Sequence, residues 1–124
     1  MSTSVKMSAL LAVGRIATGA ALLASPGRLG ALWLGGAAAN PGTQLAIRAL
    51  GVRDLVLGVG ALSALGDERR LRRWIGAGAV CDLTDAAGAM ATPATALPDG
   101  AREGTVAMGA GAALAGALTH RALR

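Results

Sequence analysis

The sequence predicts an all-α fold, a four-helix bundle that crosses a membrane. Apolar residues make up 53% of the chain and charged residues only 15%, whereas a soluble domain carries about 25% charged residues. The mean hydropathy of +0.53 agrees with this reading. Four long apolar stretches are separated by short segments that contain Pro, Gly and charged residues. Because Cys81 is the single cysteine, a disulfide scaffold is excluded, and the apolar content excludes a disordered chain.

Each apolar stretch is about as long as a helix that crosses a hydrocarbon core of roughly 30 Å. Their ends coincide with helix breakers, since Pro26 follows the first stretch, Pro41 precedes the second and Pro93 closes the third. The whole chain, residues 1–124, is therefore expected to be one membrane domain. The expected helices span residues 7–24, 43–65, 74–92 and 103–120.

A fifth apolar segment, residues 29–39, is too short to cross a membrane. We expect it to lie along the outer surface or to re-enter the membrane partway, between the first two helices. Trp33 and Trp74 are the only large aromatic residues, and both fall near the expected membrane interfaces, where indole rings are favoured.

The positions of Lys and Arg predict the orientation. Lys6, Arg121 and Arg124 fall on one side together with four arginines of an expected loop, residues 69–73, while Arg28 and Arg102 fall on the other. Both termini are therefore expected in the cytoplasm, in a multi-pass protein of the inner, or plasma, membrane. A cleavable signal sequence is the alternative for residues 7–24, but a charged residue in its centre, Arg15, argues against it.

The net charge of +5 suggests nucleic acid as a partner only if the basic residues form a binding face. Here they gather at one end of the expected bundle, and no aromatic side chains are interleaved to stack on bases. We therefore expect membrane lipid with anionic headgroups as the partner, and no nucleic acid.

Small residues recur at helical spacing, as in Gly51, Gly58 and Ala61 of the second stretch and Gly104 and Gly116 of the last. In a membrane such residues allow close helix packing, and their faces also permit a homodimer. An Ala- and Gly-rich composition without a packing role is the alternative.

Six ionisable residues lie inside the apolar stretches. A charged side chain near the bilayer centre costs about 2.5–3.5 kcal/mol, so these side chains are expected to face one another or a wet cavity. Arg48 lies nearer the outer face than the others, which cluster close to the midplane. The six are Arg15 in the first stretch, Arg48, Arg53 and Asp54 in the second, and Asp82 and Asp85 in the third.

The spacing also predicts how the charges pair. Asp54 shares a face with Gly51 and Gly58, so a neighbouring helix can bring Arg15 to it. Arg53 points about 100° away from Asp54 around the helix, and the two are not expected to neutralise each other. We expect Arg53 to present its forked guanidinium to two carboxylates of the third helix, those of Asp82 and Asp85.

Two interpretations of these charges stay open. In one, the ion pairs only fix the register of the bundle. In the other, paired carboxylates beside arginines line a cavity and carry out acid–base chemistry or relay protons. The candidate catalytic residues are then Asp82, Asp85 and Asp54, and the residues that bind substrate or tune the carboxylates are Arg15, Arg48 and Arg53.

The segment Arg48-Ala49-Leu50-Gly51-Val52-Arg53-Asp54-Leu55-Val56-Leu57-Gly58 is similar to the central motif of a family of uncharacterised small four-helix bacterial membrane proteins. The later Asp82-Leu83-Thr84-Asp85-Ala86 matches that family's Asp-x-x-Asp-Ala, and Gly14-Arg15 also fits. The resemblance covers roughly residues 8–90. It implies the four-helix fold and draws attention to the charged residues, and it implies no activity.

Three functions remain as hypotheses. The first is an acid–base enzyme, an isomerase, cyclase or epoxide-opening hydrolase, that acts on a hydrophobic small molecule. The second is a proton- or cation-coupled transporter, and the third is an accessory membrane scaffold without chemistry. No cofactor and no metal are expected, because the aspartates lack His and Cys neighbours.

Overall fold

The computed structural model describes residues 1–124, and its elements are all helical. The four expected long helices are all present, each extended by a few residues at its beginning. The all-α prediction is confirmed. The long helices are α1 (Thr3–Ala24), α3 (Pro41–Ser63), α4 (Glu68–Ala91) and α5 (Ala101–Ala122).

The starts of α1 and α3 are set by side chains that cap free backbone N–H groups. Ser2 accepts a hydrogen bond from the backbone N–H of Val5, and Asn40 accepts two at the start of α3, where Pro41 is the first helical residue. Both arrangements satisfy donors that the first helical turn leaves unpaired.

The arginine-rich segment, residues 69–73, is not the loop that the sequence suggested. It forms the first turns of α4, because the Asp67 carboxylate accepts hydrogen bonds from the backbone N–H groups of Arg69 and Arg70. The acidic Glu68 in this first turn adds a favourable interaction with the helix dipole. The basic residues therefore extend a helix beyond its apolar part.

The short apolar segment between the first two long helices is also helical. It forms α2 (Pro26–Leu34) and the 3₁₀ helix η1 (Gly35–Ala39), with Gly35 at a positive φ of 61° where the two meet. α2 packs on the start of α3, since a Cβ at Gly30 would lie 2.7 Å from Cδ1 of Ile47. A second 3₁₀ helix, η2 (Ala94–Ala96), lies in the connection between α4 and α5.

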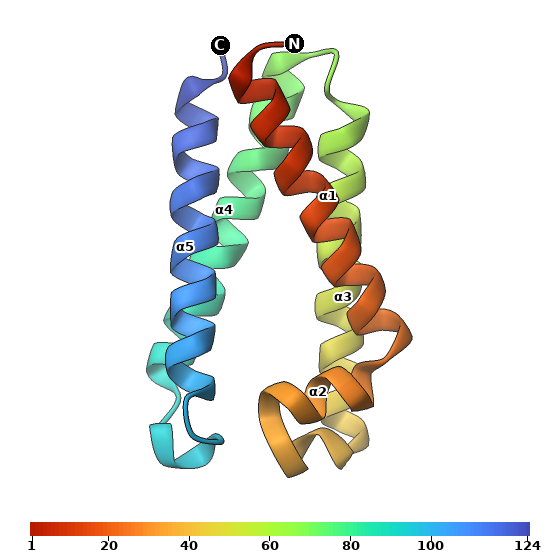
Figure 1. Cartoon of the computed structure of the whole chain (residues 1–124), viewed down its shortest axis with the longest axis vertical. Helices are drawn as coiled ribbons and strands as arrows, with labels where there is room; N and C mark the ends of the chain where they lie inside the picture. The colour runs from red at the N-terminus through yellow and green to blue at the C-terminus, as the bar shows by residue number, and fades with distance from the viewer.

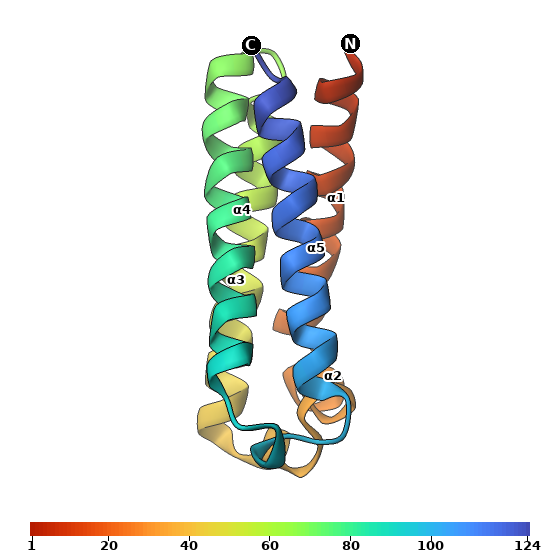
Figure 2. The ribbon, with the colours of Figure 1, turned by 90° about the vertical axis from the view of Figure 1, so that its left-hand side faces the viewer.

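The long helices form two closely packed pairs, α1 with α3 and α4 with α5 (Figures 1 and 2). Both termini and the turn between α3 and α4 lie at one end, here called the terminal end, and α2 and η2 lie at the opposite end (Figure 1). Glycines set the spacing within each pair. A Cβ at Gly58 of α3 would lie 2.7 Å from the carbonyl oxygen of Ala12, and one at Gly109 of α5 would lie 2.8 Å from that of Asp82.

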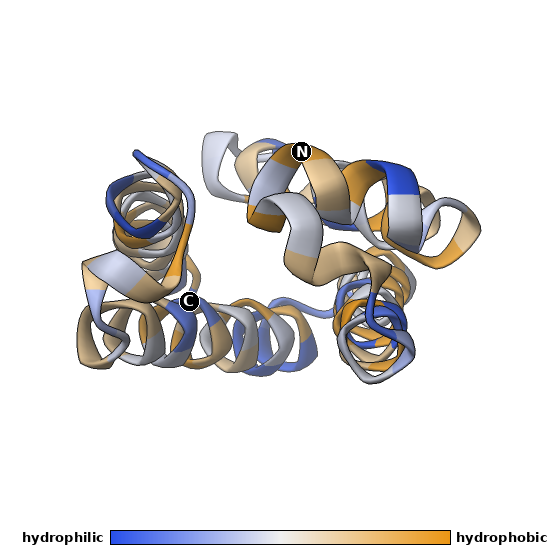
Figure 3. Cartoon of the chain, turned by 90° about the horizontal axis from the view of Figure 1, so that it is seen from below, coloured by the Kyte–Doolittle hydropathy of each residue, from blue (hydrophilic) through white to orange (hydrophobic).

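The core is small, because only 25 of the 124 residues are buried. Its main apolar cluster lies toward the terminal end and includes Val5, Leu71, Ile75 and Leu123. Large apolar side chains are instead exposed on the outer faces of every long helix, and apolar segments recur along all the helices in Figure 3. Examples are Leu10 and Val13 on α1, Val52, Val56 and Val59 on α3, Val80 and Leu83 on α4, and Met108 and Leu114 on α5.

One helix, α1, is both long enough and apolar enough to cross a membrane on length and composition. Only 17% of the most apolar 18-residue stretch of α1 is buried inside the protein. α1 is therefore not a core helix that other helices cover on all sides. Charged residues lower the mean hydropathy of α3 and α4, and Gly, Thr and the charged residues near both ends lower that of α5.

Candidate functional site

Five of the six predicted charged residues meet between the two helix pairs. They lie near the middle of their helices, and we call them the Arg/Asp cluster: Arg15 of α1, Arg53 and Asp54 of α3, and Asp82 and Asp85 of α4. The sequence located this group correctly, and the ion pairs within it join α1 and α3 to α4.

Arg15 binds two carboxylates. Its Nη1 lies 3.4 Å from Oδ1 of Asp54, as predicted, and 3.2 Å from Oδ1 of Asp82. Its Nη2 also donates to Oδ2 of Asp82, so this second pair is bidentate. Asp82 therefore pairs with Arg15 and not with Arg53, which corrects the expected pairing.

Gly78 makes room for the Arg15 side chain, a role that the sequence reasoning missed. A Cβ at this position would lie 2.7 Å from Nη2 of Arg15. Gly78 precedes Asp82 by one helical turn, and this spacing was the available signal. A glycine one turn before an acidic residue on a helix can admit a guanidinium from a neighbouring helix.

Arg53 forms the second bidentate pair. Its Nη1 and Nη2 lie 2.8 Å and 2.7 Å from the two carboxylate oxygens of Asp85. Nη2 also lies 3.4 Å from Oδ1 of Asp54, although the two residues were expected to turn away from each other. The angle between adjacent Cα–Cβ bonds did not decide this contact, because the long arginine side chain reaches back toward its neighbour.

The cluster has three carboxylates for two guanidinium groups, so it carries one formal negative charge in excess. Asp54 and Asp82 are nearly covered, with 12% and 9% of their side chains exposed, whereas 34% of the Asp85 side chain is exposed. One donor, Nε of Arg53, is buried without a hydrogen-bond partner. Because its side chain is the most exposed of the three carboxylates, Asp85 is the member of the cluster that another molecule reaches most easily.

Arg48 does not join the cluster. It is exposed on α3, and no ion pair or hydrogen bond of its side chain is present. Its position on the helix turns it away from the face that carries Asp54, so Arg48 does not contact the carboxylates, and its role in substrate binding or charge tuning stays a prediction.

A pocket of about 430 Å³ lies between the two helix pairs, at the end of the bundle that holds α2. Asp85 is the one residue of the cluster in its wall, and we call this space the Asp85 pocket. The indole Nε1 of Trp33 donates a hydrogen bond of 2.8 Å to the hydroxyl of Thr105, which ties α2 to α5 beside the pocket. The lining residues are Trp33, Leu34, Thr43, Ala46, Ile47, Leu50, Thr84, Asp85, Gly88, Ala89, Thr92, Leu97 and Thr105.

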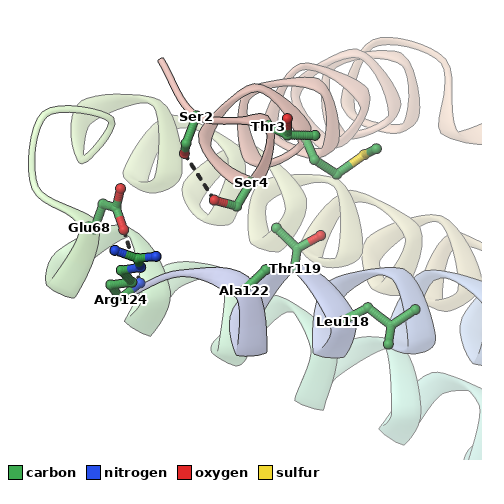
Figure 4. Close-up of a pocket in the computed structure, with 9 residues that line it drawn as sticks. Ser2, Thr3, Ser4, Glu68, Leu118, Thr119, Ala122 and Arg124 are labelled. Atoms are coloured by element: carbon green, nitrogen blue, oxygen red, sulfur yellow. Dashed lines mark hydrogen bonds between the residues drawn. The ribbon is translucent and has the colours of Figure 1, made fainter.

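A larger pocket, of about 670 Å³, opens at the terminal end (Figure 4). Residues from both ends of the chain and the start of α4 line it, among them Ser2, Thr3, Glu68 and Arg124. The Glu68 carboxylate accepts a hydrogen bond of 2.9 Å from the backbone N–H of Arg124. No residue of the Arg/Asp cluster lines this pocket, so the smaller Asp85 pocket is the better candidate for a functional site.

No protein-family model matches this sequence, and comparisons with curated proteins and with solved structures found no similar protein. The arguments about function therefore rest on the cluster and the pocket.

Proposed function

We propose that this chain is a small four-helix integral membrane protein that binds a hydrophobic small molecule beside the Arg/Asp cluster and acts on it by acid–base chemistry. The observation that carries this proposal is the Asp85 pocket, in which a carboxylate is exposed in a largely apolar wall. Pockets of this kind, apolar with a few converging polar groups, are typical of small-molecule sites.

The membrane location is supported by the distribution of side chains. Charged residues gather between the helices, while large apolar residues such as Val56 and Leu114 face outward. A water-soluble bundle places its apolar stripe inward. The outward apolar faces suit lipid, and the inward ion pairs avoid the cost of a charge in hydrocarbon.

The chemistry we propose for Asp85 is that of a general base. Its carboxylate removes a proton from a carbon atom of the bound molecule, and the electron pair of the broken C–H bond moves into an adjacent π system. The proton then returns to a different carbon, which yields an isomer and regenerates the carboxylate.

The other members of the cluster support Asp85 rather than react. Both guanidinium groups are engaged with carboxylates, so Arg53 acts as a positioning residue that fixes the orientation of Asp85. Asp82 and Asp54 do not line the pocket and hold the arginines in place. This favours Asp85 alone as the reactive group, in place of the expected pair of Asp82 and Asp85.

The test is deuterium exchange into the bound molecule. The protein is purified in lipid nanodiscs in D₂O, and the hydrophobic molecules that remain bound are extracted and weighed by mass spectrometry. We expect a co-purifying molecule that gains deuterium at carbon with the native protein and with Asp99→Asn, an acidic residue outside the pocket. Asp85→Asn should lower the exchange rate per bound molecule by about 100-fold or more. A native protein without any bound molecule or without exchange overturns the proposal.

A second candidate function is proton- or cation-coupled transport, and the excess negative charge favours it. Ion pairs join the two helix pairs beside the pocket, and a cation that enters the pocket would interact with Asp85, the carboxylate in its wall. The test is whether a pH gradient across the membrane of proteoliposomes drives uptake of the co-purifying molecule into them. Uptake that is abolished by Asp85→Asn and proceeds without deuterium exchange at carbon would favour transport over catalysis.

A further inference from the structure

We infer that the molecule bound in the Asp85 pocket is a hydrophobic organic cation, such as an amine that carries a positive charge. This inference rests on the proposed function, since it names the class of molecule that the same pocket takes.

The first argument is charge. The Arg/Asp cluster has one formal negative charge in excess. Asp85 is the carboxylate of the cluster that lies in the pocket wall. No lysine or arginine lines the pocket. The attraction between two charges is stronger beside apolar walls than in open water, because the walls replace part of the surrounding water. A cation is therefore favoured over a neutral molecule, and an anion is disfavoured.

The second argument is the free capacity of Asp85. Arg53 donates one hydrogen bond to each carboxylate oxygen, and each oxygen has a second lone pair. An ammonium group or a positively charged methyl-ammonium surface can approach from the pocket side without displacing the guanidinium.

The third argument is the aromatic wall. Trp33 is the one aromatic residue of the pocket, and its hydrogen bond to Thr105 fixes the indole ring. An indole face attracts organic cations through its quadrupole. Ile47 and Leu50 from α3 supply apolar surface for the body of the same molecule.

A positive charge on the ligand also suits the chemistry proposed for Asp85. Where the cationic nitrogen belongs to a π system, as in C=N⁺, a C–H bond on the adjacent carbon is acidic enough for a carboxylate to act on it as a base. Loss of the proton gives a neutral enamine as the intermediate, and return of the proton to another carbon gives an isomeric cation and regenerates the carboxylate.

The experiment compares two probes of the same shape, benzyltrimethylammonium and its uncharged isostere neopentylbenzene. Binding is measured by Trp33 fluorescence in a Trp74→Phe variant, in nanodiscs of zwitterionic phosphatidylcholine that do not attract cations. We expect the cation to bind at least about tenfold more tightly than the isostere. The preference should remain in Asp99→Asn and in the charge-conserving Asp85→Glu, and it should disappear in Asp85→Asn.

The outcomes separate the two proposals. Equal binding of both probes overturns the assignment of a cation and leaves a hydrophobic-ligand pocket standing. A cation preference that persists in Asp85→Asn also overturns it, because the charge would then act from elsewhere. Binding of neither probe, together with no co-purifying molecule, overturns the proposed function as well. Circular dichroism of each variant checks that the helices are intact.

Discussion

Two arginines of α3 show how position on a helix decides the role of a charged residue. Arg53 lies on the face that meets α4 and forms a two-point ion pair with Asp85. Arg48 lies earlier on the same helix, is exposed and has no ion pair. The sequence marks both as charges inside an apolar stretch, and only the packing of α3 against α4 distinguishes them.

Replacing Arg53 by Lys should destabilise the protein although the charge is kept. An ammonium group cannot donate two parallel hydrogen bonds to one carboxylate, and it is too short to also reach Asp54. We expect a loss of about 1–3 kcal/mol in unfolding free energy, measured by unfolding in mixed detergent and denaturant. Arg48→Lys is the matched control on the same helix and should leave the free energy unchanged. Equal effects of the two substitutions would contradict the roles assigned here.

At the scale of the helices, glycines and not large apolar side chains set the packing. Gly58 lets α3 approach the backbone of α1 near Ala12, and Gly19 of α1 lies against Gly51 of α3 in the same way. Other glycines carry no such role, since a Cβ at Gly14, Gly104 or Gly111 would meet nothing within 4 Å. The expectation that Gly104 packs against another helix is therefore wrong, whereas Gly116 does meet Ala79.

The substitution Gly58→Ala should separate α1 from α3, because the new methyl group would lie 2.7 Å from a backbone oxygen that cannot move alone. We expect a cost of about 1–3 kcal/mol, as for other overpacked sites. Gly14→Ala is the control, since its Cβ meets open space and alanine favours a helix by up to about 1 kcal/mol. Thermal unfolding followed by circular dichroism measures both. A Gly58→Ala protein as stable as the native one would show that the pair tolerates a wider spacing.

At the scale of the whole molecule, two tight helix pairs are joined by a small number of polar contacts. The ion pairs of Arg15 and Arg53 cross between the pairs, and so does the hydrogen bond from Trp33 to Thr105. The apolar core toward the terminal end completes the junction. The Asp85 pocket lies where the two pairs meet at the opposite end, so its shape depends on these few contacts.

The proposed topology places the two ends of the bundle on opposite sides of a membrane. In a Cys81→Ala background, Gly66→Cys lies in the turn between α3 and α4, and Asp99→Cys lies in the connection between α4 and α5. With an impermeant maleimide on intact cells, we expect Asp99→Cys to be labelled from outside. Gly66→Cys should be labelled only after permeabilisation, because the basic residues at that end favour the cytoplasm. Labelling of both positions from the same side would contradict a bundle that crosses the membrane.

The helices and the members of the cluster can be predicted from local patterns in the chain. Apolar stretches punctuated by Pro26, Pro41 and Pro93 are a local signal, and the structure confirms four long helices at nearly the expected positions. Charges inside an apolar stretch are costly wherever it packs, so five of the six could be expected to meet, as they do. Asp67 shows how a cap changes a helix boundary: its carboxylate accepts hydrogen bonds from the first turn of α4, so the arginine-rich segment is helical and not a loop.

The partner of each charge, and the choice of the carboxylate that reaches a cavity, depend on how the helices pack together. Whether Asp82 or Asp85 receives Arg53 depends on the rotation and height of α4 relative to α3, and these follow from contacts such as Gly78 against Arg15. The pocket arises from residues of α2, α3, α4 and α5 that are far apart in sequence. Spacing along one helix fixes a face, but pairing between helices is set by the summed packing of all of them, and no single segment of the sequence contains that information.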